Sequence, residues 1–142
     1  MATMVTIRPA PRTRNRALPI AITALVAATA LTHLFMGVMF ASIATQPAAA
    51  AAMSGEVAVL AFMVLFSLNA AGYAILNVAH YLPALRRIRR LTRFALIGFA
   101  ALTIVAYFAA AQGNFLSAFG LADKAIEVAL IALLVIEDRR RR

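Results

Sequence analysis

The stretch PALRRIRRLTRF, residues 83–94, places five arginines between two long apolar segments of the chain. Further outward, four arginines lie within residues 8–16 and four more make up residues 139–142. The shorter connections within each pair of apolar segments contain no lysine or arginine. Basic segments beside membrane spans are retained in the cytoplasm. The alternation therefore predicts a membrane protein whose N- and C-termini are both cytoplasmic.

The composition supports a membrane protein over a soluble one. Of 142 residues, 64% are hydrophobic and 13% are charged, against about half and about a quarter in soluble domains. The net charge of +9 comes from arginines that flank apolar segments, so we expect them to contact anionic headgroups at the cytoplasmic face and not nucleic acid. We predict a multi-pass protein of the bacterial cytoplasmic (inner) membrane.

Four apolar segments are each near or above the roughly 20 residues that cross a bilayer as a helix. The predicted fold is all-α, an integral membrane four-helix bundle. The chain contains no cysteine, which excludes disulfides and thiolate metal sites. The predicted order is a basic cytoplasmic tail (1–16), helix 17–43, an external loop (44–55), helix 56–82, a basic amphipathic cytoplasmic loop (83–93), helix 94–112, a short external turn (113–114, extending to 120 in one alternative), helix 115–136 and an Arg-rich cytoplasmic tail (137–142).

Two alternatives concern the ends of these segments. The N-terminal arginines and apolar run also resemble a cleaved signal peptide, but the run is longer than the ~7 to 15 apolar residues of a signal. The last helix begins either at residue 115 or near Leu121. In the second register Asp123 lies in the first helical turn, where the helix dipole favours a carboxylate, and in the first it lies inside the membrane.

Polar residues interrupt the apolar segments at similar predicted depths. A rise of about 1.5 Å per residue places Glu127 near the membrane midplane in the first register and inside the hydrocarbon in both. If the polar helix faces point inward, these residues form a polar seam that continues to His80 at the cytoplasmic edge. The candidate intramembrane polar or ion site is Glu127, Asp123, Lys124, His33, Asn69, Tyr73 and Asn77.

Three interpretations of this site remain open. The side chains can be structural and join helices by hydrogen bonds, a role that the 34 alanines, which allow close packing, make reasonable. A midplane carboxylate can instead be a proton or cation site. In the third interpretation Glu127 or Lys124 faces a charge on another subunit.

The sequence gives no support for catalysis or a cofactor. As axial haem ligands, His33 and His80 would lie about 20 Å or more apart on antiparallel helices. Metal-binding patterns such as HExxH, nucleophile motifs and phosphate loops are absent. We therefore predict no enzyme activity, no cofactor and no metal site.

The basic loop itself shows helical spacing, because Leu85, Ile88 and Leu91 are three residues apart with arginines on the remaining face. This spacing predicts a short helix lying in the headgroup region. Its arginines are candidates to contact anionic lipid or an acidic partner: Arg86, Arg87, Arg89, Arg90 and Arg93.

The C-terminal half (NAAGYAILNVAHYLP, RFALIGFAALTIVAYF and GLADKAIEVALIALL) resembles small four-transmembrane-helix bacterial membrane proteins of uncharacterised activity. The resemblance implies the fold and no functional residue. We expect a non-catalytic accessory or assembly subunit that packs with other membrane subunits or with copies of itself. The alternative is a small proton- or cation-coupled transporter or channel that uses the acidic residues of the last helix.

Overall fold

A computed structural model describes residues 16–52, 56–110 and 117–141, and within these ranges the chain is helical and contains no strand. The predicted all-α class is confirmed. The elements are α1 (Ala17–Ala44), α2 (Pro47–Ala52), α3 (Glu56–Tyr81), the 3₁₀ helix η1 (Pro83–Ile88), α4 (Arg89–Ala110) and α5 (Ala118–Arg141).

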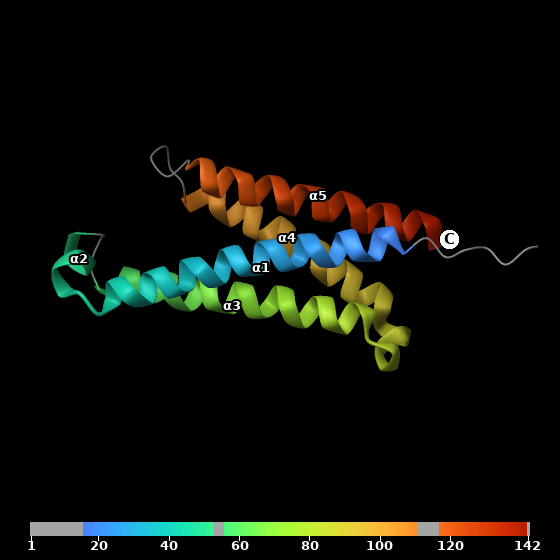
Figure 1. The fold of residues 1–142 in the computed structure, drawn as a ribbon, viewed down its shortest axis with the longest axis horizontal. Helices are drawn as coiled ribbons and strands as arrows, with labels where there is room; N and C mark the ends of the chain where they lie inside the picture. The colour runs from blue at the N-terminus through green and yellow to red at the C-terminus, as the bar shows by residue number, and fades with distance from the viewer. Residues whose placement is uncertain (1–15, 53–55, 111–116, 142) are drawn as a thin grey trace, which may run out of the picture.

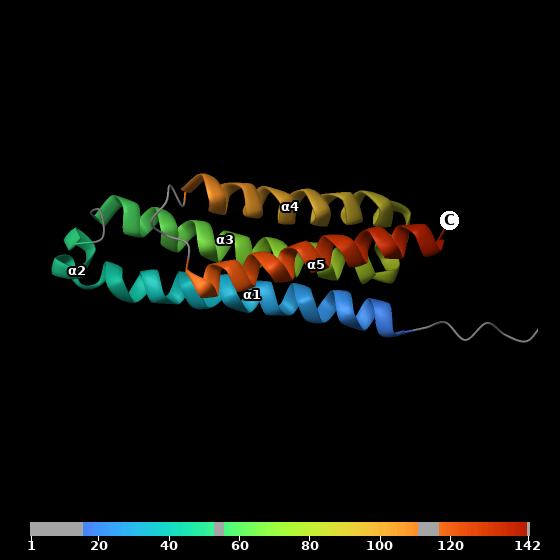
Figure 2. The ribbon, with the colours of Figure 1, turned by 90° about the horizontal axis from the view of Figure 1, so that it is seen from above.

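The four long helices form an antiparallel bundle (Figures 1 and 2). The start of α1, η1 and the end of α5 lie at one end of the bundle, and α2 lies at the other (Figure 1). Helix α1 packs against α3 and α5, and α4 packs against the same two helices. Among the described residues the diagonal pairs, α1 with α4 and α3 with α5, have no Cα atoms within 8 Å of each other. The centre of the bundle is therefore reached only by side chains.

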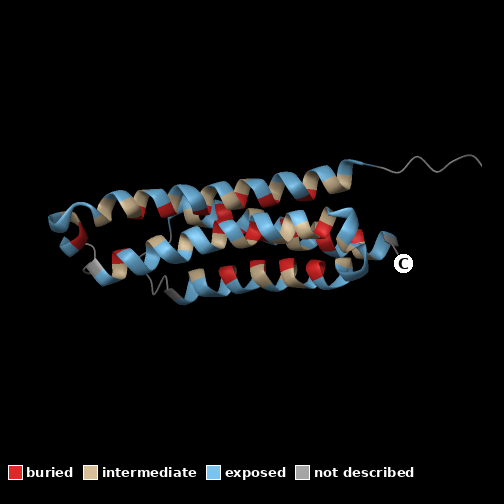
Figure 3. Cartoon of the chain, turned by 90° about the horizontal axis from the view of Figure 1, so that it is seen from below, coloured by how far each residue is buried: buried red, intermediate tan, exposed pale blue. Residues whose placement is uncertain are grey.

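Three helices are long and apolar enough to cross a membrane: Ala17–Ala44, Val57–Tyr81 and Pro83–Ala109. Their outward faces carry large apolar side chains; Leu31, Ile75 and Val105, for example, are each more than 60% exposed. Buried residues are confined to the inner faces of the helices (Figure 3). A soluble bundle places charged and polar residues on the outside, so this surface is one that lipid would cover.

The main apolar core takes residues from all four long helices. Its fully or almost fully buried members are Ile22, Val26, Tyr73, Leu96, Ala100, Leu130 and Leu134. A second, smaller cluster joins Phe40, Ala50 and Val59 at the α2 end. There the Phe40 ring stacks on Phe62 and Phe66 at centroid distances of 5.3 and 5.6 Å. Helix α2 thus closes the end of the α1–α3 pair.

Within the external loop predicted for residues 44–55, Pro47–Ala52 forms the short helix α2. Proline is favoured in the first turn of a helix, and the five alanines that follow have the highest helix propensity. Ala50 is completely buried, so packing also holds the turn in place. Residues 53–55 of the predicted loop lie outside the described residues.

The basic loop differs from the separate surface helix that its spacing predicts. Residues Pro83–Ile88 form the 3₁₀ helix η1, and Arg89 already begins α4. The arginines from 89 onward therefore belong to a long helix, because nothing between Arg89 and Ala110 breaks its hydrogen-bond pattern.

Helix α5 begins between the two registers considered from the sequence. Its first residue is Ala118, and the Ser117 hydroxyl oxygen accepts a hydrogen bond from the Gly120 backbone N–H at 3.0 Å. Serine in this position is a favoured N-cap. Asp123 consequently lies in the second turn. The predicted turn at 113–114 and the basic tail up to residue 15 lie outside the described residues.

Candidate functional site

A cluster of polar and charged side chains surrounds Glu127 in the middle of α5. We call it the Glu127 cluster. Each member is at most 7% exposed, although the surrounding surface is apolar. Its residues are Thr29 and His33 from α1, Tyr73 from α3, Thr103 from α4, and Asp123, Lys124 and Glu127 from α5.

The Glu127 carboxylate is completely buried and is bonded from all four long helices. Its Oε1 atom accepts hydrogen bonds from the hydroxyls of Tyr73 at 2.9 Å and Thr103 at 2.8 Å, and a longer one from Thr29 at 3.4 Å. Its Oε2 atom accepts from the Lys124 ammonium group at 2.7 Å. Hydrogen bonds to an ionised group are the strong ones, so these donors hold the carboxylate in one position.

Asp123 lies one turn before Glu127 and shares two of its partners. Its Oδ1 accepts from the Thr29 hydroxyl at 2.8 Å, and its Oδ2 lies 2.9 Å from the Lys124 nitrogen. Lys124 is thus placed between two carboxylates, and its ammonium group is also 5.7 Å from the centre of the Tyr107 ring. The structure therefore contains the i, i+3 ion pair between Lys124 and Glu127 that the sequence suggests.

His33 completes the cluster from α1. Its Nδ1 atom donates to the Thr29 carbonyl oxygen at 2.8 Å, because a carbonyl oxygen can only accept. In the neutral ring Nε2 is then the unprotonated nitrogen, and it faces Asp123 Oδ2 at 4.0 Å, beyond hydrogen-bonding distance. The ring is flanked by Phe66 and Tyr73 at centroid distances of 5.7 and 5.8 Å, which fix its orientation.

The charges of the cluster do not cancel while His33 is neutral. Two carboxylates and one ammonium group leave one negative charge in an enclosed region. An uncompensated charge out of water costs several kcal/mol. One additional proton, on His33 or on a carboxylate, makes the cluster neutral.

A second polar cluster lies toward the η1 end of the bundle, and we call it the His80 cluster. His80 Nε2 lies 2.9 Å from Glu137 Oε2, and His80 Nδ1 lies 3.2 Å from the Thr92 hydroxyl. Arg93 forms a close ion pair with Asp138, and its Nε lies 3.7 Å from Glu137. The Thr92 hydroxyl is also 3.0 Å from the Arg89 carbonyl. When it donates there, its oxygen can accept a hydrogen bond from His80 Nδ1.

Five of the seven residues predicted for the intramembrane site meet in the Glu127 cluster: Glu127, Asp123, Lys124, His33 and Tyr73. Asn69 and Asn77 are half-buried and are not part of it. The Asn77 side-chain oxygen is buried without a hydrogen-bond partner. The structure thus shows no contact that would support a place for these two asparagines in the predicted site.

The continuous polar seam that the sequence predicts from Glu127 to His80 is not observed. Buried Leu130 and Leu134 lie between Glu127 and Glu137 on α5, and Leu96 and Ala100 lie between Arg93 and Thr103 on α4. These side chains form one apolar layer with Val26. The layer separates the polar groups into two clusters, and it also separates His33 from His80.

The five loop arginines fall into two groups. Arg86, Arg87 and Arg90 are exposed and remain candidates to contact lipid. Arg89 donates to the His80 carbonyl oxygen at 2.9 Å, and Arg93 is 5% exposed and paired with Asp138. Arg93 is therefore turned inward, away from the surface where the sequence predicts contact with anionic lipid or an acidic partner.

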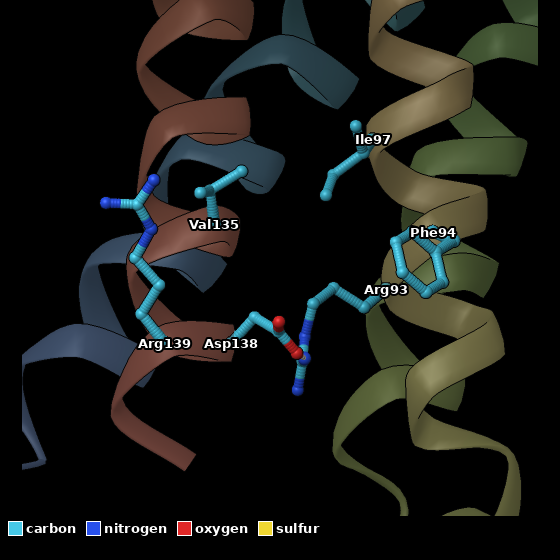
Figure 4. Close-up of a pocket in the computed structure, with 6 residues that line it drawn as sticks. All are labelled: Arg93, Phe94, Ile97, Val135, Asp138 and Arg139. Atoms are coloured by element: carbon cyan, nitrogen blue, oxygen red, sulfur yellow. Dashed lines mark hydrogen bonds and ion pairs between the residues drawn. The ribbon is translucent and has the colours of Figure 1, made fainter. Parts of the chain in front are cut away.

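A surface pocket of about 400 Å³ lies between α4 and α5 beside the His80 cluster (Figure 4). It is lined by Arg93, Phe94, Ile97, Val135, Asp138 and Arg139. Asp138 and Arg93 point toward each other across it (Figure 4). Sequence reasoning missed Glu137, Asp138 and Thr92, because the two acids directly precede four arginines that would neutralise them locally. One signal for these acids was available in the sequence, because two basic residues, His80 and Arg93, lie on the neighbouring helices.

Comparisons of the chain with protein-family models, curated proteins and solved structures gave no match.

Proposed function

We propose that the protein is a four-span protein of the bacterial inner membrane with both ends in the cytoplasm. Three spans follow from α1, α3 and the η1–α4 segment. Helix α5 runs antiparallel to α4 beside it (Figure 2), and its 24 residues extend about 36 Å at 1.5 Å per residue. Its charged residues Asp123, Lys124 and Glu127 face the bundle interior, where a span can hold them. The arginine distribution supports the orientation.

We further propose that the Glu127 cluster couples the binding of one proton to the transport of a cation. The observation that carries this proposal is the single excess negative charge enclosed by the four helices. Glu127 and Lys124 are bonded within the chain, which gives no support to the interpretation in which one of them faces a charge on another subunit. The enclosed charge supports the proton-coupled alternative.

The test is cation-driven proton movement in proteoliposomes with an acidic interior. Addition of a cation to the wild-type protein is expected to dissipate the pH gradient, read with a pH-sensitive dye. The Glu127→Gln substitution keeps the volume of the side chain and one accepting oxygen but removes its charge, and is expected to abolish the response.

Leu134→Val is the matched control, because it alters a buried α5 side chain outside the cluster. It is expected to retain the response. A Glu127→Gln protein that folds and dissipates the gradient as fast as the wild type would refute the coupling role.

A second candidate function, packing with another membrane subunit, is favoured by a notch of about 350 Å³ on the α1–α3 surface. Small side chains line part of it, including Gly37, Ala41 and Ser67. Small residues let membrane helices approach closely. Extraction in mild detergent followed by identification of co-purifying proteins tests this candidate, and a pure monomer would exclude it.

A further inference from the structure

Three side chains of the Glu127 cluster have the composition of a metal site. One coordinating atom each from His33, Asp123 and Glu127 lies within 4.8 Å of the others, and all three residues are buried. A set of one imidazole nitrogen and two carboxylate oxygens suits divalent first-row metal ions, whereas alkali and alkaline-earth ions prefer oxygen ligands alone. The sequence alone does not indicate this set, because its members lie on two different helices and form no local motif.

The orientation of His33 is the second observation. Metal-binding histidines typically donate the hydrogen of the non-coordinating nitrogen to a carbonyl or carboxylate. His33 does this through Nδ1 to the Thr29 carbonyl at 2.8 Å. Its Nε2 lone pair is directed at Asp123 Oδ2 across 4.0 Å, a separation too long for a hydrogen bond. A buried coordinating nitrogen thus points into the site without a bond of its own there.

The Lys124 ammonium group marks where a cation lies. It is 2.9 Å from Asp123 and 2.7 Å from Glu127. The same nitrogen lies 5.7 Å from the centre of the Tyr107 ring. When Lys124 is displaced from the two carboxylates, they carry a charge of −2, which one divalent ion neutralises.

We infer that His33, Asp123 and Glu127 bind a divalent first-row transition-metal ion, and that the Lys124 ammonium group occupies the site in exchange with this ion. The inference deepens the proposed function by naming the class of cation, and its relevance to transport rests on that function. Binding itself does not depend on transport. Lys124 acts as a tethered competitor that compensates one of the two carboxylate charges whenever the metal has left.

Cobalt(II) binding to the purified, untagged protein in detergent tests the inference, because Co²⁺ in a nitrogen–oxygen site has a visible absorption spectrum. The wild-type chain is expected to bind one Co²⁺. Lys124→Met removes the competing charge at similar length and is expected to bind at least about ten times more tightly. His33→Gln is expected to lose the spectrum. His80→Gln, which alters the other histidine outside the site, is expected to keep it.

The inference is overturned if the wild type binds no Co²⁺ at concentrations that saturate Lys124→Met, or if His33→Gln binds as the wild type does. Elution volume and helical circular dichroism identify folded variants. If Lys124→Met does not fold, the comparison of wild type, His33→Gln and His80→Gln still decides the matter. Absence of metal binding would leave the proton-coupling test with Glu127→Gln untouched, so the two proposals fail separately.

Discussion

Glu127 is the residue on which the four long helices converge, since each contributes a hydrogen-bond donor to its carboxylate. Such convergence has a structural effect as well as a chemical one. A charged acceptor that loses a donor in a buried site keeps its desolvation cost without full compensation. Each donor is therefore expected to contribute to stability even if it takes no part in proton binding.

Tyr73→Phe isolates this effect at one donor. The substitution removes the hydroxyl that bonds Glu127 at 2.9 Å and Thr103 at 3.0 Å and leaves the buried ring in place. We expect the free energy of unfolding to fall by about 1–2 kcal/mol, the range for a hydrogen bond to a charged group reduced for a membrane setting. Titration with a denaturing detergent measures this change.

Ser42→Ala is the control for Tyr73→Phe. Its hydroxyl bonds only the Met39 carbonyl of its own helix, at 2.7 Å, and is exposed. Its removal is expected to leave the unfolding free energy nearly unchanged. Equal effects of the two substitutions would show that the Tyr73 hydroxyl does not stabilise the cluster.

The sequence predicted most of the charged members of the Glu127 cluster, but not how they are bonded. Charged residues in an apolar segment must face the interior, so Asp123, Lys124 and Glu127 were recognisable from spacing and hydropathy. The rotation of α3 about its own axis could not be recognised in this way. Asn69 and Tyr73 are one turn apart, and only packing decides that Tyr73 reaches Glu127 while Asn69 does not.

At the scale of the helices, glycines set how closely the elements approach. A Cβ atom on Gly37 of α1 would lie 2.8 Å from the Ser67 hydroxyl oxygen and 3.3 Å from the Ser67 backbone nitrogen of α3. The hydroxyl can rotate away, but the backbone nitrogen can move only with its helix. Gly98 of α4, by contrast, has open space around the corresponding position.

Gly37→Ala and Gly98→Ala form a matched pair. Alanine in place of glycine favours a helix by about 0.8–1 kcal/mol, and Gly98→Ala is expected to gain an appreciable part of this. Gly37→Ala must also displace α3, so its unfolding free energy is expected to be lower than that of Gly98→Ala. The same denaturing-detergent titration measures both. Equal stability gains would contradict the close α1–α3 approach.

Helix ends were predicted less well than the helices, for reasons that differ between elements. The helix ends predicted to be external carry no arginines, so nothing in the hydropathy pattern fixed the start of α5, which Ser117 sets by capping the Gly120 N–H. Helix α2 was missed because a run of alanines reads equally as a linker or a helix. Its burial against Phe40 and Val59 decides between them.

At the scale of the whole molecule, the proposed topology makes a direct prediction about accessibility. The chain contains no cysteine, so single cysteines can be introduced without removing any. Cysteines at the exposed positions Thr45 and Ala118 are expected to react with a membrane-impermeant maleimide in intact cells. Cysteines at the exposed positions Ala84 and Arg140 are expected to react only after permeabilisation.

The Arg140 position carries the most information in that experiment. Labelling there in intact cells would show that α5 does not cross the membrane and would remove the fourth span. Labelling at Ala84 in intact cells would reverse the orientation inferred from the arginine clusters. The Thr45 and Ala118 cysteines serve as positive controls for the reagent.

The two polar clusters share a geometric property that bears on how the bundle deforms. Helices α3 and α5 have no close backbone contact among the described residues, yet Tyr73 bonds Glu127 and His80 bonds Glu137 across that diagonal. These two hydrogen-bonded pairs link α3 to α5 on either side of the apolar layer. A displacement that slides α5 along α3 lengthens both hydrogen bonds together, so the bundle resists this motion at two points about 15 Å apart, ten residues along one helix.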